Sequence, residues 1–302
     1  MAQPAPLVPE EVLALQAEQF SMGRMVWRRF RRHKLALLGM ITLSVLALLA
    51  IFAPLIAPYS YTHMDFSAIL HAPYAKHIFG TDEIGHDVFS QFLYGGRYSL
   101  FIGLSATIVL VFIGTVVGAV SGYYGGWVDM VLMRFTDVML TFPVLLLQIA
   151  VASELKGGNS LFLIIAIIAL FSWMTVARLV RGEFLRFRNL EFAEAARAAG
   201  AGDSRIIFRH ILPNAIGPVL VSATLSIGGA ILTESALSFL GLGVQPPTPT
   251  WGNMIGTTQA AAPIAPWLVV FPGLGIVLTV LAINFIGDGI RDALDPTAMA
   301  KK

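Results

Sequence analysis

One stretch of the sequence, FGTDEIGHDVFS, gathers side chains that commonly bind metal ions. It offers carboxylates and an imidazole, which are ordinary ligands of divalent metals, from Asp82, Glu83, His86 and Asp87. The same residues have a simpler use, because aspartates in glycine-punctuated stretches often cap helices and hydrogen-bond turns. We therefore predict capping and loop hydrogen bonds for Asp82 and Asp87, and no metal site.

Two further carboxylates, Asp137 and Glu234, stand inside long apolar stretches. A charge at the centre of a membrane-spanning helix costs roughly 2.5 to 3.5 kcal/mol on insertion scales, so each needs a partner or water. Arg134 lies one turn before Asp137 and is the predicted ion-pair partner. Glu234 has no basic neighbour at helical spacing; it could face an aqueous pathway, cap a broken helix or pair with another subunit. Both remain candidates for pathway or partner contacts.

Common catalytic motifs are missing from the sequence. It contains no H-E-x-x-H, no nucleophile with a placed base, and no G-x-x-x-x-G-K-[ST] phosphate loop. It also contains no cysteine, which excludes disulfides, cysteine-bound zinc and thiol nucleophiles. We therefore predict that the chain is not an enzyme, carries no cofactor and does not bind ATP through a phosphate loop.

The composition is that of a membrane protein. Of 302 residues, 56% are hydrophobic and 13% charged, which is too apolar for a soluble protein of this size. A spanning helix needs roughly 20 mostly apolar residues. This predicts an all-α integral membrane protein with six transmembrane helices, at residues 35–57, 98–121, 130–152, 161–180, 214–241 and 267–287.

Two of these spans raise questions. The first is too long for a cleaved signal, and Pro58 follows its only plausible cleavage site, so we expect it to remain as an anchor. The fifth contains Gly228 and Gly229 and could bend or break there, leaving five spans and a re-entrant segment. In the second span, Gly114, Gly118 and Gly122 form a stripe that should let another helix pack closely.

The positions of Lys and Arg predict the orientation. Apart from Lys76, Arg97 and Lys156, all of them fall on one side of the six-span arrangement. That side is therefore predicted to be cytoplasmic. It includes both termini and the loop 181–213, whereas the loop 58–97 is predicted to be extracytoplasmic.

The predicted organisation has three parts. Residues 1–34 form a cytoplasmic tail, in which residues 1–9 are expected to be disordered and residues 10–34 to form an amphipathic helix on the inner leaflet. A contact of this helix with a cytosolic protein is the alternative, and its basic cluster is explained by membrane lipid without any nucleic acid. Residues 35–290 form the transmembrane domain, and residues 291–302 form a cytoplasmic tail.

The segment EFAEAARAAGAGDSRIIFRHILPN, residues 191–214, is a charged, alanine-rich loop between apolar runs. It predicts a helix, a turn at Gly200 to Gly202, and a second helix from Ser204 that stops at Pro213. Small alanine side chains let another surface approach, and Glu194 offers it a charge. This is the pattern of a membrane protein that meets a soluble partner.

The spacing of Glu194, Ala195, Ala196, Gly200, Leu212 and Pro213 resembles the EAA loop of ABC importer permeases. Other blocks, in order along nearly the whole chain, resemble the C-type permease of the oligopeptide, dipeptide and nickel branch of that family. His86 and Gln91 depart from the arginines common in the branch, and His210 from the isoleucine of the general EAA pattern. The blocks are FGTDEIGHDVFS, GYYGGWVD, RFTDVMLTFP, EAARAAG, FRHILPNA, ESALSFLGLGVQPPTPTWG and FPGLGIVLTVLAINFIGDGIRDALDP.

The resemblance implies a type I importer permease in a bacterial inner membrane. Such a chain pairs with a homologous B-type permease to form the pathway, two ABC ATPase subunits bind ATP and Mg, and an extracytoplasmic solute-binding protein delivers the substrate. The six residues of the EAA pattern would then dock in a cleft of one ATPase.

Several alternatives remain at the level of sequence. An ion-coupled secondary transporter would need an intramembrane relay and usually internal repeats, and two separated carboxylates make a poor relay. A membrane scaffold would not explain the cytoplasmic loop. Among substrates, peptides are favoured over nickel chelates or other small solutes, because no span offers a metal-binding pair at helical spacing.

Overall fold

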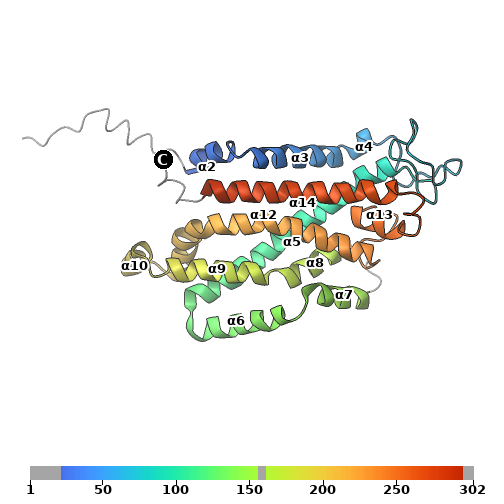
Figure 1. Cartoon of the computed structure of the whole chain (residues 1–302). Helices are drawn as coiled ribbons and strands as arrows, with labels where there is room; N and C mark the ends of the chain where they lie inside the picture. The colour runs from blue at the N-terminus through green and yellow to red at the C-terminus, as the bar shows by residue number, and fades with distance from the viewer. Residues whose placement is uncertain (1–21, 156–160, 295–302) are drawn as a thin grey trace, which may run out of the picture.

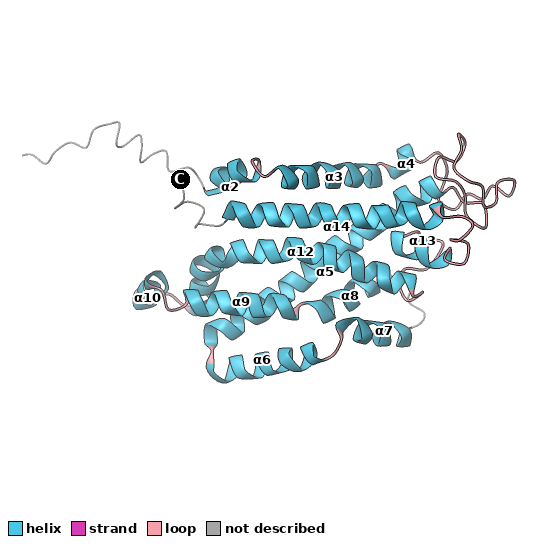
Figure 2. Ribbon diagram, viewed as in Figure 1, coloured by secondary structure: helices cyan, strands magenta, loops and turns pink. Residues whose placement is uncertain are grey.

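The computed structural model describes residues 22–155 and 161–294, and within those ranges the regular elements are all helices (Figures 1 and 2). The predicted disordered segment 1–9 lies outside the described residues, as do residues 10–21 of the predicted interfacial helix and most of the C-terminal tail. The helices, in chain order, are α2 (Met22–Phe30), α3 (Lys34–Ile51), α4 (Ala53–Ile56), α5 (Val88–Tyr124), α6 (Gly126–Thr141), α7 (Val144–Glu154), α8 (Leu161–Ser172), α9 (Met174–Phe187), α10 (Glu191–Ala198), α11 (Asp203–Arg205), the π-helix η1 (Ile206–Ile211), α12 (Leu212–Phe239), α13 (Trp251–Thr257) and α14 (Trp267–Leu294).

Within the described residues, four helical runs are long and apolar enough to cross a membrane unbroken: α3, α5, the run from α11 to α12, and α14. The predicted number of six is reached if two bent helix pairs each count as one span, α6 with α7, which meet at 83°, and α8 with α9, which meet at 47°. The first bend falls at Pro143, which favours an extended conformation in the preceding residue, and Phe142 is extended.

The fifth span does not break at Gly228 and Gly229. Instead, α12 runs without interruption from Leu212 to Phe239. Glycine keeps its backbone N–H, so helical hydrogen bonding can continue through it. Gly228 is buried beside α14, where a Cβ would lie 3.6 Å from Val280, whereas Gly229 is exposed.

The oblique helix α5 crosses the bundle and packs along α9 (Figure 1). Its glycine stripe faces that helix. A Cβ on Gly114 would lie 2.7 Å from the Cβ of Val176, and one on Gly122 would lie 2.6 Å from the Cβ of Phe184. Atoms do not approach so closely, so the predicted close packing is confirmed and larger side chains at these glycines would push the helices apart.

The bundle has two different ends (Figure 1). The helix α10, the start of α2 and the end of α14 lie at one end, while α4, α13 and the loop between α4 and α5 lie at the other. The loop 181–213 therefore shares an end with both ends of the described chain.

Candidate functional site: the loop between α9 and α12

The helix α10 projects beyond the spans at its end of the bundle (Figure 1). Of its eight residues, Ala193 alone is buried, and this residue seats the helix on the bundle. Glu194 and Ala195 are exposed, whereas Ala196 is half-buried against the core. The alanine-rich helix therefore has an inner side that packs and an outer side that is free to meet another protein.

The helix ends in a turn that requires glycine at position 200. Gly200 has a φ of 78°, and no other atom lies within 4 Å of where its Cβ would be. The N–H of Ala201 donates to the carbonyl oxygen of Ala196, which is the hydrogen bond of a Schellman helix end. The left-handed backbone conformation, and not crowding, is what selects glycine here. The predicted turn is confirmed.

The return to the membrane differs from the prediction at Pro213. The proline does not stop the second helix but lies in the first turn of α12, directly after the π-helix η1. In η1 the N–H of Leu212 donates to the carbonyl oxygen of Ile207, five residues back. A wider π-helical turn leaves room for a ring that lacks an N–H donor, so the chain continues through the proline.

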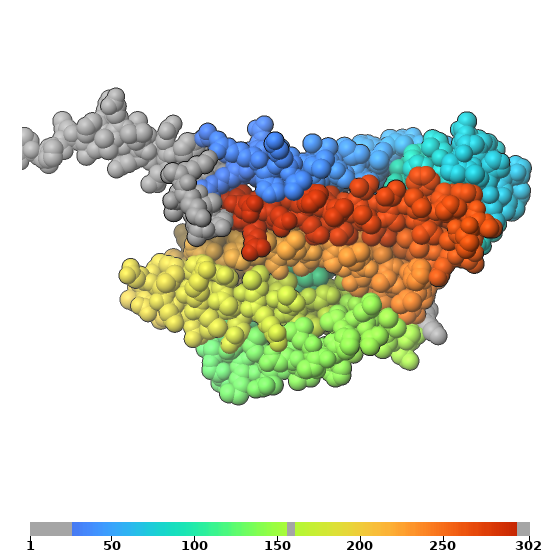
Figure 3. Space-filling model, in the orientation of Figure 1, coloured from blue at the N-terminus to red at the C-terminus, as the bar shows by residue number. Residues whose placement is uncertain are grey.

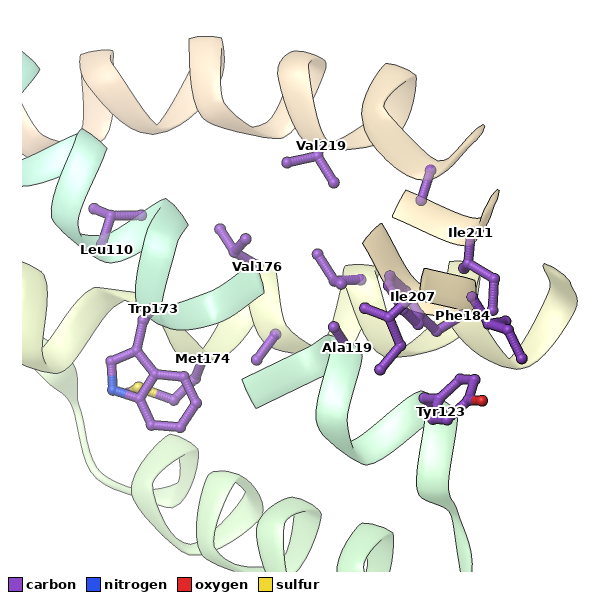
Figure 4. Packing of buried hydrophobic residues seen from close by; sticks show 14 of the residues in the cluster. Leu110, Ala119, Tyr123, Trp173, Met174, Val176, Phe184, Ile207, Ile211 and Val219 are labelled. Carbon is purple, nitrogen blue, oxygen red and sulfur yellow. The ribbon is translucent and has the colours of Figure 1, made fainter. Parts of the chain in front are cut away.

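A hydrophobic cluster connects this loop to the spans (Figure 4). Ile206, Ile207 and Ile211 of η1 are buried against α5 and α9, whose contributions include Tyr123 and Phe184. Leu212 and Ala196 pack partly against the same cluster. Of the six EAA-pattern residues, Ala196 and Leu212 therefore pack on the inner side of the loop. The other four are exposed: Glu194, Ala195, Gly200 and Pro213.

Polar contacts reinforce the base of the loop. The hydroxyl of Tyr123 donates to Asp203 Oδ1 at 2.7 Å, and the Arg188 guanidinium donates to the carbonyl oxygen of Gly122 at 3.0 Å. Arg181 binds both carboxylate oxygens of Asp129, at 2.5 and 2.6 Å. The sequence did not predict these contacts, because the partners lie tens of positions apart along the chain.

Glu234 is fully buried within the chain. Its carboxylate accepts a hydrogen bond from Ser238 at 2.7 Å and a longer one from Ser99 of α5 at 3.4 Å. The Ser99 hydroxyl oxygen in turn accepts from the backbone N–H of Trp251. In this fold Glu234 therefore joins α12, α5 and α13.

Asp137 is paired with Arg178 of α9, across 2.5 Å. The predicted pairing with Arg134 is wrong, because α6 lies beside α9 and Arg178 reaches the carboxylate from there. Both side chains of the pair are about half exposed, Asp137 to 47% and Arg178 to 50%.

At the opposite end of the bundle, the two aspartates Asp82 and Asp87 cap a helix and hydrogen-bond the loop, as predicted. Asp87 caps α5 by accepting from the Ser90 N–H, and it also accepts a 2.8 Å hydrogen bond from the buried His77. Asp82 accepts from the backbone N–H of His86. In the part of the chain that the structure describes, no group of three or more His, Cys, Asp or Glu side chains could hold a metal.

In the same loop, Asp65 accepts hydrogen bonds from Lys76 and Ser67. The bond from the Lys76 ammonium, followed by those from Ser67, holds the pKa of the Asp65 carboxyl well below its usual range. The Lys76 side chain is about half exposed, so the ion pair contributes little to stability.

Comparison with known proteins identifies the family. A family model described as the binding-protein-dependent transport system inner membrane component matches residues 114–299. The chain belongs to this family. A second model, the N-terminal transmembrane domain of oligopeptide transport permease C, matches residues 21–73. The permease therefore has the type I fold of these transporters, and it is a transport subunit and not an enzyme.

Curated relatives align with the permease over most of its length. The dipeptide transport system permease protein of Alkalihalophilus pseudofirmus is 45% identical over 276 residues, covering 91% of this chain and 90% of the relative. The glutathione transport system permease protein of Escherichia coli is 45% identical over 271 residues, which are 89% of each chain. The glutathione permease of Pectobacterium atrosepticum is 42% identical over 274 residues, 90% of each chain.

Proposed function

We propose that this permease is one of two membrane chains of an ATP-driven importer of small peptides. Its relatives are named for dipeptide and glutathione transport, which favours peptides over nickel chelates or other small solutes. A homologous B-type permease would complete the pathway. Two ABC ATPase subunits would bind ATP and Mg, and a solute-binding protein would deliver the peptide at the opposite end.

The observation that carries the proposal is the form of α10. The outer side of α10 bears Glu194 and Ala195, while Ala196 packs against the cluster in which the η1 isoleucines meet α5, α9 and α12. A small helix that fits a cleft on one side and is rigidly backed on the other can convert the movement of an ATPase into rocking of the spans.

We infer that the end carrying α10 faces the cytoplasm of a bacterium, across its inner membrane. The concentration of Lys and Arg at this end supports that orientation. Exposed aromatic side chains of Tyr124, Trp127 and Phe208 lie near the same end, where rings commonly sit at the membrane interface. Residues 1–34 and 291–302 would then be cytoplasmic tails, and residues 58–97 would lie outside.

Substitution of Ala195 tests the docking role. Ala195→Arg places a long charged side chain on the outer side of α10 without touching the core, whereas Ala196 is half-buried and its replacement would disturb packing as well. We expect the ATPase subunits to bind at least about tenfold more weakly, the equivalent of about 1.4 kcal/mol of docking energy, so that they co-purify poorly and uptake by the reconstituted transporter falls. Ala260→Arg, at an exposed position near the opposite end, should retain its ATPase subunits. Normal uptake by Ala195→Arg would contradict docking at α10.

The same preparation separates this proposal from an ion-coupled transporter. Uptake into proteoliposomes should require ATP and persist when ion gradients are dissipated. Uptake driven by an ion gradient without ATP would establish the alternative class.

A further inference from the structure

The last turn of α5 binds a cation that comes from α9. The helix ends at Tyr124, so the carbonyl oxygens of Gly122 and Tyr123 lie where a helix leaves its acceptors without donors of its own. The Arg188 guanidinium donates to both of them, at 3.0 and 3.4 Å. A cation also suits the partial negative charge at the C-terminal end of a helix. Arg188, which directly follows α9, is therefore attached to the end of α5.

A second attachment involves the side chain at the same place on α5. The Tyr123 hydroxyl donates to Asp203, which begins α11 just after the turn that follows α10. The Tyr123 ring is buried in the hydrophobic cluster, so its hydroxyl has a fixed position (Figure 4). Arg197 of α10 is a further polar neighbour of this hydroxyl. The segment 189–202 is thus attached to one turn of α5 at both of its ends.

These two attachments restrict how α10 can turn. The helix lies within the segment 189–202 and buries Ala193 alone, so its own packing holds it weakly. A segment held at one point can pivot, whereas a segment held at two points on the same helix keeps one orientation. In the space-filling view the green turn between α5 and α6 lies against the yellow α9, and α10 extends beyond this base (Figure 3).

The helix α5 connects this base to the opposite end of the bundle (Figure 1). It is continuous over 37 residues, which at 1.5 Å per residue is a length of roughly 55 Å. Near its start, the Ser99 hydroxyl oxygen accepts from the backbone N–H of Trp251, and the Phe92 carbonyl oxygen accepts from the indole of the same residue. A movement of the last turn of α5 would therefore be carried to α13.

We propose that Arg188 and Asp203 are positioning residues that hold α10 on the last turn of α5, so that the two helices move as one unit when an ATPase moves α10. The inference rests on the proposed function and deepens it, since it names a span that receives the movement. The η1 isoleucines also join the loop to α5. Apolar contacts are not directional, whereas hydrogen bonds with a charged partner are strong and set one geometry.

A double variant tests whether the attachments serve coupling. Arg188→Gln with Asp203→Ala removes two hydrogen bonds with charged partners, so we expect peptide uptake per ATP hydrolysed to fall at least about threefold, while the ATPase subunits still co-purify. Arg188→Lys with Asp203→Asn keeps a donor and an acceptor and should restore most of the ratio. The matched control changes Arg186, which pairs with Glu183 of its own helix, and the exposed Ser204. Arg186→Gln with Ser204→Ala should keep the wild-type ratio.

The possible results separate coupling from folding and docking. An unchanged ratio in the variant Arg188→Gln with Asp203→Ala would overturn the proposal. Loss of the ATPase subunits from that variant would overturn it too, because the residues would then maintain the fold or the docking surface instead. Failure of the proposed function shows itself separately, as uptake by the wild-type transporter that needs no ATP.

Spin labels test the rigid unit without any uptake. The chain has no cysteine, so Glu191→Cys on α10 and Tyr124→Cys at the end of α5, both at exposed positions, give two labelled sites. The other subunits of the transporter are made cysteine-free. Electron paramagnetic resonance should give the same distance between the labels with and without ATP, and a shifted or broader distribution once Arg188→Gln and Asp203→Ala are added. A distance that changes with ATP in the otherwise unaltered chain, or one that stays equally well defined in the double variant, would overturn the proposal.

Discussion

Each end of the bundle carries a short helix, and the two helices differ in how much of their length is buried. At one end, α10 buries Ala193 alone and is followed by Gly200, which has open space around it. At the other, α13 buries Trp251 and the three residues after it, and Thr250 and Asn253 form a capping box at its start. The exposure of α10 suits the proposed docking on a partner, whereas α13 is buried over the first four of its seven residues.

At the α13 end of the bundle, two glycines leave room for a buried aromatic ring. The Trp251 indole lies against Gly96 of α5 and Gly275 of α14, where a Cβ would come within 2.8 Å of its atoms. Its Nε1 donates to the carbonyl oxygen of Phe92 at 3.0 Å. Among the described residues of α10 there is no fully buried aromatic ring of this kind. We therefore expect substitutions at the α13 end to affect folding, and substitutions on α10 to affect coupling.

The largest effect should come from Trp251→Ala. Removing a fully buried ring costs about 3 to 5 kcal/mol of unfolding free energy, and here the Phe92 carbonyl also loses its donor. Thermal unfolding of the purified complex measures the change. Trp127→Ala is the matched control, since that ring is 74% exposed, and it should unfold almost as wild type does. Similar losses in both variants would mean that α13 is not the more tightly held element.

A smaller effect is expected at the buried carboxylate. Glu234→Leu removes the acceptor of the Ser238 and Ser99 hydroxyls and should cost about 1 to 3 kcal/mol, the range for leaving buried polar groups unpaired. Glu234→Gln keeps an acceptor and should lose less, as measured by thermal unfolding of the purified complex. Equal losses in the two variants would contradict the role given to these hydrogen bonds.

The glycine turn after α10 allows a comparison between two neighbouring glycines. Gly200→Ala forces an alanine into a left-handed conformation, at about 1 to 2 kcal/mol. Gly202→Ala should be nearly neutral, because Gly202 has a φ of −69° and free space for a Cβ. The coupling of ATP hydrolysis to uptake is measured alongside stability. Equal behaviour of the two variants would show that the shape of this turn is not needed.

The smallest effect should follow from Tyr123→Phe. It deletes one hydroxyl and its hydrogen bond to Asp203, which is worth about 0.5 to 1.5 kcal/mol. Because that bond joins the end of α5 to α11, coupling should weaken slightly while assembly continues. Tyr124→Phe, at a half-exposed neighbouring ring, is the control, and a larger loss there would contradict the role given to Tyr123.

Much of the architecture could be predicted because its causes are local. Apolar runs of spanning length located four unbroken spans and two bent helix pairs, the four-residue spacing of Gly114, Gly118 and Gly122 indicated close packing, and Gly200 marked a turn that needs a left-handed residue. The prediction that Pro213 ends the second helix was wrong, because the rule that proline ends a helix assumes α-helical hydrogen bonding before it. The π-helix η1, stabilised by isoleucines packed on α5 and α9, removes that assumption.

The linear order of residues by itself determined an all-helical membrane protein with an exposed alanine-rich loop, since hydropathy and backbone preference act over a few neighbouring positions. Only the tertiary structure decided what the charges inside the spans do. Asp137 and Glu234 look alike in the sequence, but one meets Arg178 on an exposed side of the bundle and the other lies buried among the serines of α5 and α12. An intramembrane carboxylate takes its partner from whichever helix packs beside it, and that helix is chosen by the whole fold.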